Sequence, residues 1–138
     1  MININNNHLS MFYMQYYYGK KYSIEELERF KRIADNYQIL TEKPTFSEEQ
    51  RKYIIQANAL NDNKDYQSAI QYYDKAIALN PVSYPAGYYN LALIASLAGD
   101  YNYAILNMKK YLLLLPNAPD AREAQDKIYG WEALTTNN

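Results

Sequence analysis

Few residues of this chain have the types that catalysis requires. His8 is the sole histidine, and the chain contains no cysteine. A catalytic or metal centre needs a nucleophile, a base or a set of ligands in a defined arrangement. His8 lies in an Asn-rich start, where a solvent-exposed side chain is the favoured interpretation. We therefore expect no catalytic residue, no metal site and no cofactor.

The acidic residues have structural explanations. Glu25-Glu26 and Glu48-Glu49 stand where the first turn of a helix would favour negative charge. Asp65 and Asp100 are placed to accept hydrogen bonds from the free amides at the start of a helix. The four glycines, at 19, 87, 99 and 130, are scattered and form no phosphate-binding loop. Enzyme activity is therefore not expected.

The central part of the chain repeats itself. A shift of 35 positions superimposes Asp65-Tyr66 on Asp100-Tyr101 and Pro81 on Pro116. The same shift pairs Tyr53 with Tyr88, Ala57 with Ala92, Ala69 with Ala104, Ile70 with Ile105, Lys75 with Lys110 and Leu79 with Leu114. A period of this length indicates stacked supersecondary units.

Each unit reads as a helix, a short polar turn, a second helix and a proline. The predicted helices cover residues 48–61, 66–79, 85–98 and 101–114. Ser47 and Gln50 form the pattern of a capping box at the first of them.

These residues resemble the tetratricopeptide repeat family. The resemblance lies in alanines where paired helices approach closely (57, 69, 92 and 104), in the Asp-Tyr pairs and in the Leu-x-Pro ends. Lys64 departs from the glycine that the second unit keeps as Gly99, and Tyr111 is bulky where the first unit has Ala76. The resemblance implies an all-α fold, a short α-solenoid of stacked antiparallel helix hairpins, that binds other proteins.

The expected organisation has three parts. Residues 1–22 form a flexible or hydrophobic N-terminal segment, residues 23–46 a helix and connector, and residues 47–134 the repeat domain. The repeat domain comprises repeats at about 50–83 and 85–118 and a capping helix at 119–134.

The N-terminal segment contains two stretches of different composition, for which we predict different behaviour. The Asn-rich Met1 to His8 is expected to be disordered, whereas Leu9 to Tyr18 has almost no polar face and needs cover. We expect Gly19-Lys20-Lys21 to end this segment. A new helix is expected to begin at a second capping box, formed by Ser23 and Glu26. The helix that follows carries an apolar stripe of Leu27, Phe30, Ile33, Ala34 and Tyr37.

The C-terminal segment resembles the terminal repeat and cap found in many bacterial repeat proteins. Pro119 is expected in the first turn of the last helix, where a missing amide costs little. Ala121, Ala124, Ile128, Trp131 and Leu134 fall on one side of this helix. We predict that Tyr111 packs against it, beside Trp131.

The resemblance also implies a binding groove, because the first helix of each pair lines the concave face in this family. The alternative for each residue is that it faces water or packs on the N-terminal helices. The implied groove residues are Arg51, Ile54, Ile55, Asn58, Asn61 and Asp62 from the first repeat, and Ala86, Tyr89, Asn90, Leu93, Ser96 and Leu97 from the second.

One subfamily clamps the C-terminal carboxylate of chaperones with lysines, arginine and asparagines. Asn58 and Asn90 match the clamp asparagines, but Ile54 replaces a lysine and Asp120 stands where a cation is wanted. We therefore expect a peptide with apolar anchors, or the chain's own Leu9 to Tyr18 segment, rather than a chaperone tail.

Charge and hydropathy exclude two classes of partner, nucleic acid and the membrane interior. With 14 Lys and Arg against 15 Asp and Glu, the chain has no excess of positive charge to attract nucleic acid. No apolar span is long enough for membrane insertion, and the start does not read as a secretory signal. We expect a cytoplasmic protein as the chain stands, or a periplasmic or secreted one if a leader was removed.

Three functions fit the sequence. The first is an adaptor or scaffold that binds a protein or peptide in the groove. The second is a homo-oligomerisation module that assembles through the N-terminal aromatic segment, since two repeats are fewer than the usual three. The third is an accessory domain of a larger bacterial envelope or secreted protein.

Overall fold

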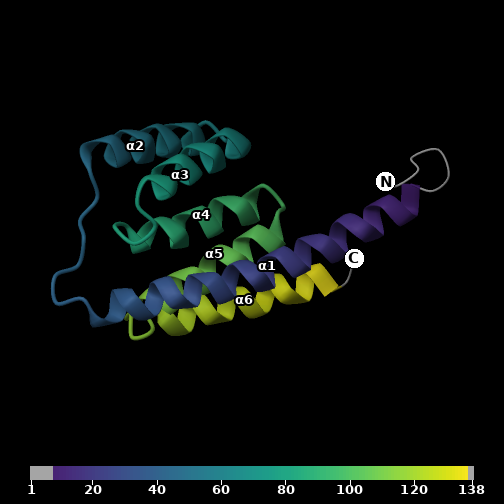
Figure 1. The fold of residues 1–138 in the computed structure, drawn as a ribbon. Helices are drawn as coiled ribbons and strands as arrows, with labels where there is room; N and C mark the ends of the chain where they lie inside the picture. Colours follow the sequence, from purple (N-terminus) through teal and green to yellow (C-terminus); the bar gives the residue numbers. More distant parts are fainter. Residues whose placement is uncertain (1–7, 137–138) are drawn as a thin grey trace.

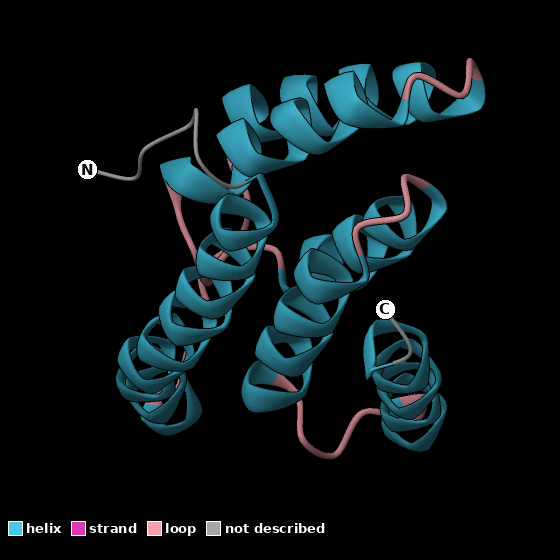
Figure 2. Cartoon of the chain, turned by 90° about the vertical axis from the view of Figure 1, so that its right-hand side faces the viewer, coloured by secondary structure: helices cyan, strands magenta, loops and turns pink. Residues whose placement is uncertain are grey.

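The structure, a computed structural model, describes residues 8–136. This part of the chain contains helices and connecting loops and no strand (Figures 1 and 2). The helices are α1 (His8–Ile39), α2 (Glu48–Asp62), α3 (Tyr66–Leu79), α4 (Pro85–Leu97), α5 (Tyr101–Leu114) and α6 (Ala121–Thr136). The all-α class is confirmed. The four repeat helices begin at the predicted residues and end within one residue of the predicted ends.

Side chains cap the repeat helices as the sequence indicates. At the start of α2, the Ser47 hydroxyl accepts from the Gln50 amide (3.1 Å) and the Gln50 side chain accepts from the Ser47 amide (3.0 Å). The Asp65 and Asp100 carboxylates each accept from the backbone N–H three residues later, at 3.3 and 3.1 Å. These bonds satisfy amides that have no partner within the helix, so the capping predictions are confirmed.

The turns inside the two repeats have the same conformation. Lys64 has φ 63° and Gly99 has φ 83°, both in the left-handed region. The Asp65 amide donates to the Leu60 carbonyl, and the equivalent Asp100 amide to the Ala95 carbonyl, both at 2.9 Å. This six-to-one bond after a left-handed residue is the Schellman motif that ends many helices. Lysine therefore occupies a position that glycine fills without strain.

The alanines lie where the paired helices meet. Ala57 and Ala69 are fully buried between α2 and α3, and Ala92 and Ala104 between α4 and α5. A side chain of one methyl group lets two helix backbones approach closely, so the predicted role of these positions is confirmed. They belong to two apolar clusters, one over α2, α3 and α4 and one over α1, α4, α5 and α6.

Polar contacts tie the first repeat to the turn before α4 and to the second repeat. The Gln50 amide oxygen accepts from the Ser83 hydroxyl at 2.9 Å, which ties α2 to the turn before α4. The Tyr103 hydroxyl donates to the Asp74 carboxylate at 2.5 Å, which ties α5 to α3. Burial raises the pKa of Asp74, although this hydrogen bond acts in the opposite direction.

The first helix corrects one prediction. Residues 19–21 do not interrupt the helix, because α1 is continuous from His8 to Ile39. Ser23 therefore lies inside α1 rather than at its start. One glycine inside a helix costs only about 1 kcal/mol, and lysine is a good helix former. The expected disorder of the Asn-rich start concerns residues 1–7, outside the described part, while His8 is the first residue of α1.

α1 packs with only part of its predicted stripe. Phe30, Ala34 and Tyr37 are buried, and the Phe30 ring meets Tyr88 of α4 edge to face with centroids 5.4 Å apart. Ile33 is 39% exposed. The buried positions follow the i, i+4, i+7 rows of a helix, and Ile33 lies to the side of that row.

Polar contacts fix α1 on α5. The Lys110 amine forms an ion pair with Glu26 at 2.6 Å and lies 5.3 Å from the centre of the Phe30 ring. The Gln38 side chain donates to the Leu114 carbonyl at 2.5 Å. α1 thus packs on the second repeat, although it precedes the first one in the sequence.

The last helix covers the end of the array. Ala124, Ile128 and Trp131 are buried against α5, as predicted, whereas Leu134 is exposed. Pro119 corrects a second expectation, since it lies in the turn before α6 and not in its first turn. The helix starts only at residue 121.

Tyr111 joins α5 to the residues that lead into α6. Its hydroxyl donates to the Asp120 carboxylate at 2.7 Å, and its ring meets Tyr89 with centroids 5.1 Å apart. Tyr111 and Trp131 belong to the same apolar cluster. The ring that faces Tyr111 is that of Tyr89 on α4, so this bulky residue fills the junction of α4, α5 and the turn before α6.

Candidate functional site

The predicted groove residues differ widely in exposure. Ile54 is buried in the cluster with Ala57, Tyr73 and Leu91 and therefore lies in the core rather than on a binding surface. The exposed members are Arg51, Ile55, Asn58, Asp62, Ala86 and Leu97. The half-buried members are Asn61, Tyr89, Asn90, Leu93 and Ser96.

Two predicted asparagines converge on one hydroxyl. The Tyr73 hydroxyl of α3 donates to the Asn58 amide oxygen of α2 at 2.6 Å. Burial raises the pKa of Tyr73 to about 12, with a further increase from the neighbouring Tyr84 and an opposing hydrogen bond from Asn90 of α4. Asn58 and Asn90 therefore approach the same point from the first helices of successive repeats.

Three residues of α4 are partly engaged in packing. Tyr89 faces Tyr111, and the pKa of Tyr89 is raised by burial and by the nearby charges of Glu123 and Asp120. Leu93 packs against the core, and its carbonyl accepts from the Ser96 hydroxyl at 2.7 Å. These side chains therefore contribute to packing and are also partly exposed.

The remaining residues form what we call the α2–α4 surface, namely Arg51, Ile55, Asn58, Asn61, Asp62, Ala86, Asn90 and Leu97. Ile55 is 49% exposed and Leu97 is 59% exposed, which is high for large apolar side chains. The Asn61 amide oxygen is buried without a hydrogen-bond partner among the described residues. A buried acceptor of this kind is usually satisfied by water or a ligand.

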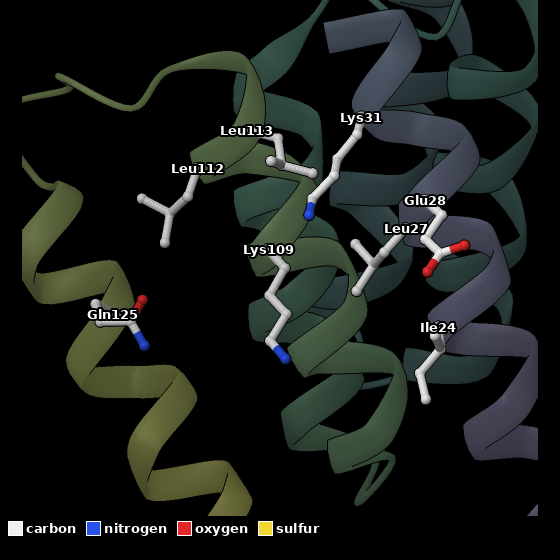
Figure 3. Close-up of a pocket in the computed structure, with 8 residues that line it drawn as sticks. All are labelled: Ile24, Leu27, Glu28, Lys31, Lys109, Leu112, Leu113 and Gln125. Carbon is white, nitrogen blue, oxygen red and sulfur yellow. The ribbon is translucent and has the colours of Figure 1, made fainter. Parts of the chain in front are cut away.

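A second candidate site lies outside the residues that the sequence predicted for binding. A hollow of about 440 Å³ lies between α1 and α6, with α5 as its floor (Figure 3). It is lined by Ile24, Leu27, Glu28, Lys31, Lys109, Leu112, Leu113 and Gln125.

A smaller hollow of about 220 Å³ continues the first along α5. The two share Ile24, Leu27 and Lys109. The smaller one is also lined by Ser23, Asn102, Ile105, Leu106, Glu132 and Thr135. We call the two together the α5 groove.

A signal for the α5 groove was present in the sequence. The run Leu112 to Leu114 places leucines on three sides of the last turn of α5, more than a helix with one buried face needs. Leu114 points into the core, whereas Leu112 and Leu113 remain half-buried at the groove. The groove offers an apolar floor with amines from Lys31 and Lys109.

Two further features bear on the chemistry of the described residues. Among the residues whose side chains the structure describes, 23–135, no three or more His, Asp or Glu side chains gather as a metal ion would require. In the same residues, no helix combines the length and hydropathy needed to span a bilayer.

The comparison with protein families agrees with the repeat geometry. Residues 53–83, which comprise most of α2, the whole of α3 and the turn that follows, match the family model of the tetratricopeptide repeat. A comparison with curated proteins finds no match. The second helix pair has the same caps, the same left-handed turn and the same buried alanines as the matched one. Residues 53–83 are thus similar to a tetratricopeptide repeat, and the second helix pair repeats their geometry within the six described helices.

Proposed function

We propose that this chain is a non-catalytic adaptor or scaffold that holds a protein or peptide against the α2–α4 surface. Repeats of this type are in general protein–protein interaction modules. The observation that carries the proposal is the approach of Asn58 and Asn90 to one hydroxyl, beside the exposed Ile55 and Leu97. Polar groups and apolar anchors thus alternate across two helices.

This arrangement suits a peptide with apolar side chains and free backbone groups. An asparagine amide both donates and accepts, so Asn58 and Asn90 can bond to the backbone of an extended peptide. Ile55 and Leu97 would contact its apolar anchors.

Acidic tails are poorer ligands for the α2–α4 surface. Its one cation, Arg51, forms an ion pair with Glu48 at 3.2 Å, and Asp62 adds a negative charge. Too little positive charge remains to offset the desolvation of a carboxylate. Submicromolar binding of an acidic C-terminal peptide in calorimetry would contradict this expectation.

Selection from a displayed library of random peptides tests the proposal. Ile55→Ser and Leu97→Ser change exposed side chains, so their effect on folding is small. Leu79→Ser is the matched control, because Leu79 is 47% exposed on α3, outside the proposed surface.

Selected peptides should bind the unchanged chain and Leu79→Ser alike. They should lose at least about tenfold in affinity, or 1.4 kcal/mol, with Ile55→Ser or Leu97→Ser. Peptides that bind all three variants equally, or a library that yields no binder, would refute the proposal.

Self-assembly is a second candidate function. It is favoured by the path of α1, whose N-terminal part extends beyond the other helices in Figure 1. Light scattering on the full chain tests it, since a monomer at all accessible concentrations would eliminate self-assembly.

A further inference from the structure

The extension of α1, residues 8–22, is unusually rich in aromatic residues. Its N-terminal part, coloured purple in Figure 1, passes the ends of α5 and α6. Residues 8–22 span about 22 Å of helix at 1.5 Å per residue. More than half of them are aromatic residues or methionine, and none is acidic. A helix of this composition is normally covered by other protein.

The α5 groove begins where this extension begins. Ser23 and Thr135 line one end of the groove, and Lys31 and Gln125 lie toward the other. Its floor runs along α5 from residue 102 to residue 113, which is about 17 Å of helix. The groove is therefore long enough to hold most of residues 8–22.

A chain cannot place this extension in its own groove. α1 is a continuous helix from His8 to Ile39, and its second half already forms one wall of the groove. Folding back would require a break that the helix does not have. The extension can reach such a groove only on another molecule.

We propose that two copies of this chain pair by exchanging these extensions, residues 8–22 of each lying in the α5 groove of the other. The proposal rests on self-assembly, the second candidate function. A two-fold axis near Tyr22 makes the two α1 helices antiparallel, as an isologous dimer requires. Position 17 of one copy then lies beside Leu27 of the other, and position 13 beside Lys31.

Charge agrees with this register. Lys20 and Lys21 lie at the end of the extension that meets Ser23 of the second copy, where Glu132 lines the groove. Farther along, the tyrosines of the extension meet the amines of Lys31 and Lys109. Ammonium groups bind the faces of aromatic rings, so the groove's cations complement an extension without acidic residues.

The buried area is sufficient for a stable dimer. The extension carries five aromatic residues between Leu9 and Tyr18. Half-burial of these rings on both extensions removes about 1,000 Å² from water, at roughly 200 Å² per ring. The two grooves lose a similar area, so the total reaches the range of about 1,200–2,000 Å² of stable interfaces.

Light scattering on full-length variants gives the first test. Ile24 is 61% exposed and lines the groove, whereas Ile39 is 79% exposed on the same helix and outside it. Ile24→Glu should weaken dimerisation by at least about tenfold, and Ile39→Glu should leave it unchanged.

Disulfide trapping gives the second test. Because the sequence contains no cysteine, each introduced cysteine can pair only with another introduced one. Met14→Cys chains mixed with Gln125→Cys chains should form a mixed disulfide under mild oxidation. Met14→Cys mixed with Gln71→Cys, an exposed position on α3, should not.

The outcomes separate the two hypotheses. A monomer at concentrations up to about 100 μM, far above the Kd of a standard interface, would refute both self-assembly and the exchange. A dimer that resists Ile24→Glu and gives no Met14–Gln125 trap would preserve self-assembly but refute the use of the α5 groove. Neither result bears on peptide binding at the α2–α4 surface, because Ile55 and Leu97 lie outside the groove.

Discussion

Replacing Phe30 with alanine tests whether α1 belongs to the folded core of the repeats. The Phe30 side chain is 4% exposed, meets the Tyr88 ring and lies under the Lys110 amine. Truncation of a buried phenylalanine costs about 3–5 kcal/mol, because transfer energy is lost and a cavity is left. Domains of this size are stable by about 5–15 kcal/mol, so the loss would be a large share of the total.

Ile33→Ala is the matched control for this prediction. Ile33 lies on the same helix and belongs to the same predicted stripe, but it is 39% exposed. Its truncation should cost less than about 1 kcal/mol. Urea unfolding followed by circular dichroism measures both variants against the unchanged chain.

Limited proteolysis distinguishes two ways in which Phe30→Ala could act. If α1 detaches while the repeats stay folded, cleavage in the connector between residues 40 and 47 will accelerate before the main unfolding transition. The measured loss is then limited to the free energy that holds α1 on α5. Equal losses for Phe30→Ala and Ile33→Ala would show that α1 is not packed as described.

Three other predictions concern single positions. Lys64→Gly should raise the free energy of unfolding by about 1 kcal/mol and Gly99→Ala should lower it by about as much, because both positions have left-handed backbone conformations. Melting temperatures of the two variants that shift in the same direction would contradict this. Tyr111→Phe should cost about 1 kcal/mol in urea unfolding, because the Asp120 carboxylate loses its donor, and an unchanged midpoint would be inconsistent with that bond. Tyr73 has a pKa raised to about 12, so its neutral form stabilises the fold below pH 10 and this contribution disappears as pH rises through 12. Between pH 10 and pH 12 the free energy of unfolding of the unchanged chain should fall by about 2–3 kcal/mol more than that of Tyr73→Phe. Equal decreases for the two proteins in urea titrations at alkaline pH would exclude this effect.

The repeat helices could be predicted because their signals are local. The caps at Asp65 and Asp100 lie within one turn of the helices that they start. The 35-residue period adds a second, independent reading of the same boundaries. Even the left-handed turn could be inferred at Gly99, and from there at Lys64 by superposition of the two units.

The candidate sites depended on information that is not local. Ile54 and Ile55 are adjacent, but consecutive residues of a helix point about 100° apart, and the family pattern did not decide which of the two faces the core. The position of α1 was not predictable, because the Lys110–Glu26 pair joins residues 84 positions apart. Without that position the α5 groove, which has α1 as a wall, could not be foreseen.

The bond between Gln38 and the Leu114 carbonyl spans 76 positions, which has a consequence during synthesis. α1 leaves the ribosome first, but the surface that it covers is complete only after α5 has emerged. At about 5–20 residues per second, the helix waits roughly 4–15 seconds for its partner. During this interval its phenylalanines and tyrosines are available to chaperones and to neighbouring nascent chains. In a polysome, the earliest encounter between two copies would therefore involve α1 before either molecule has finished folding.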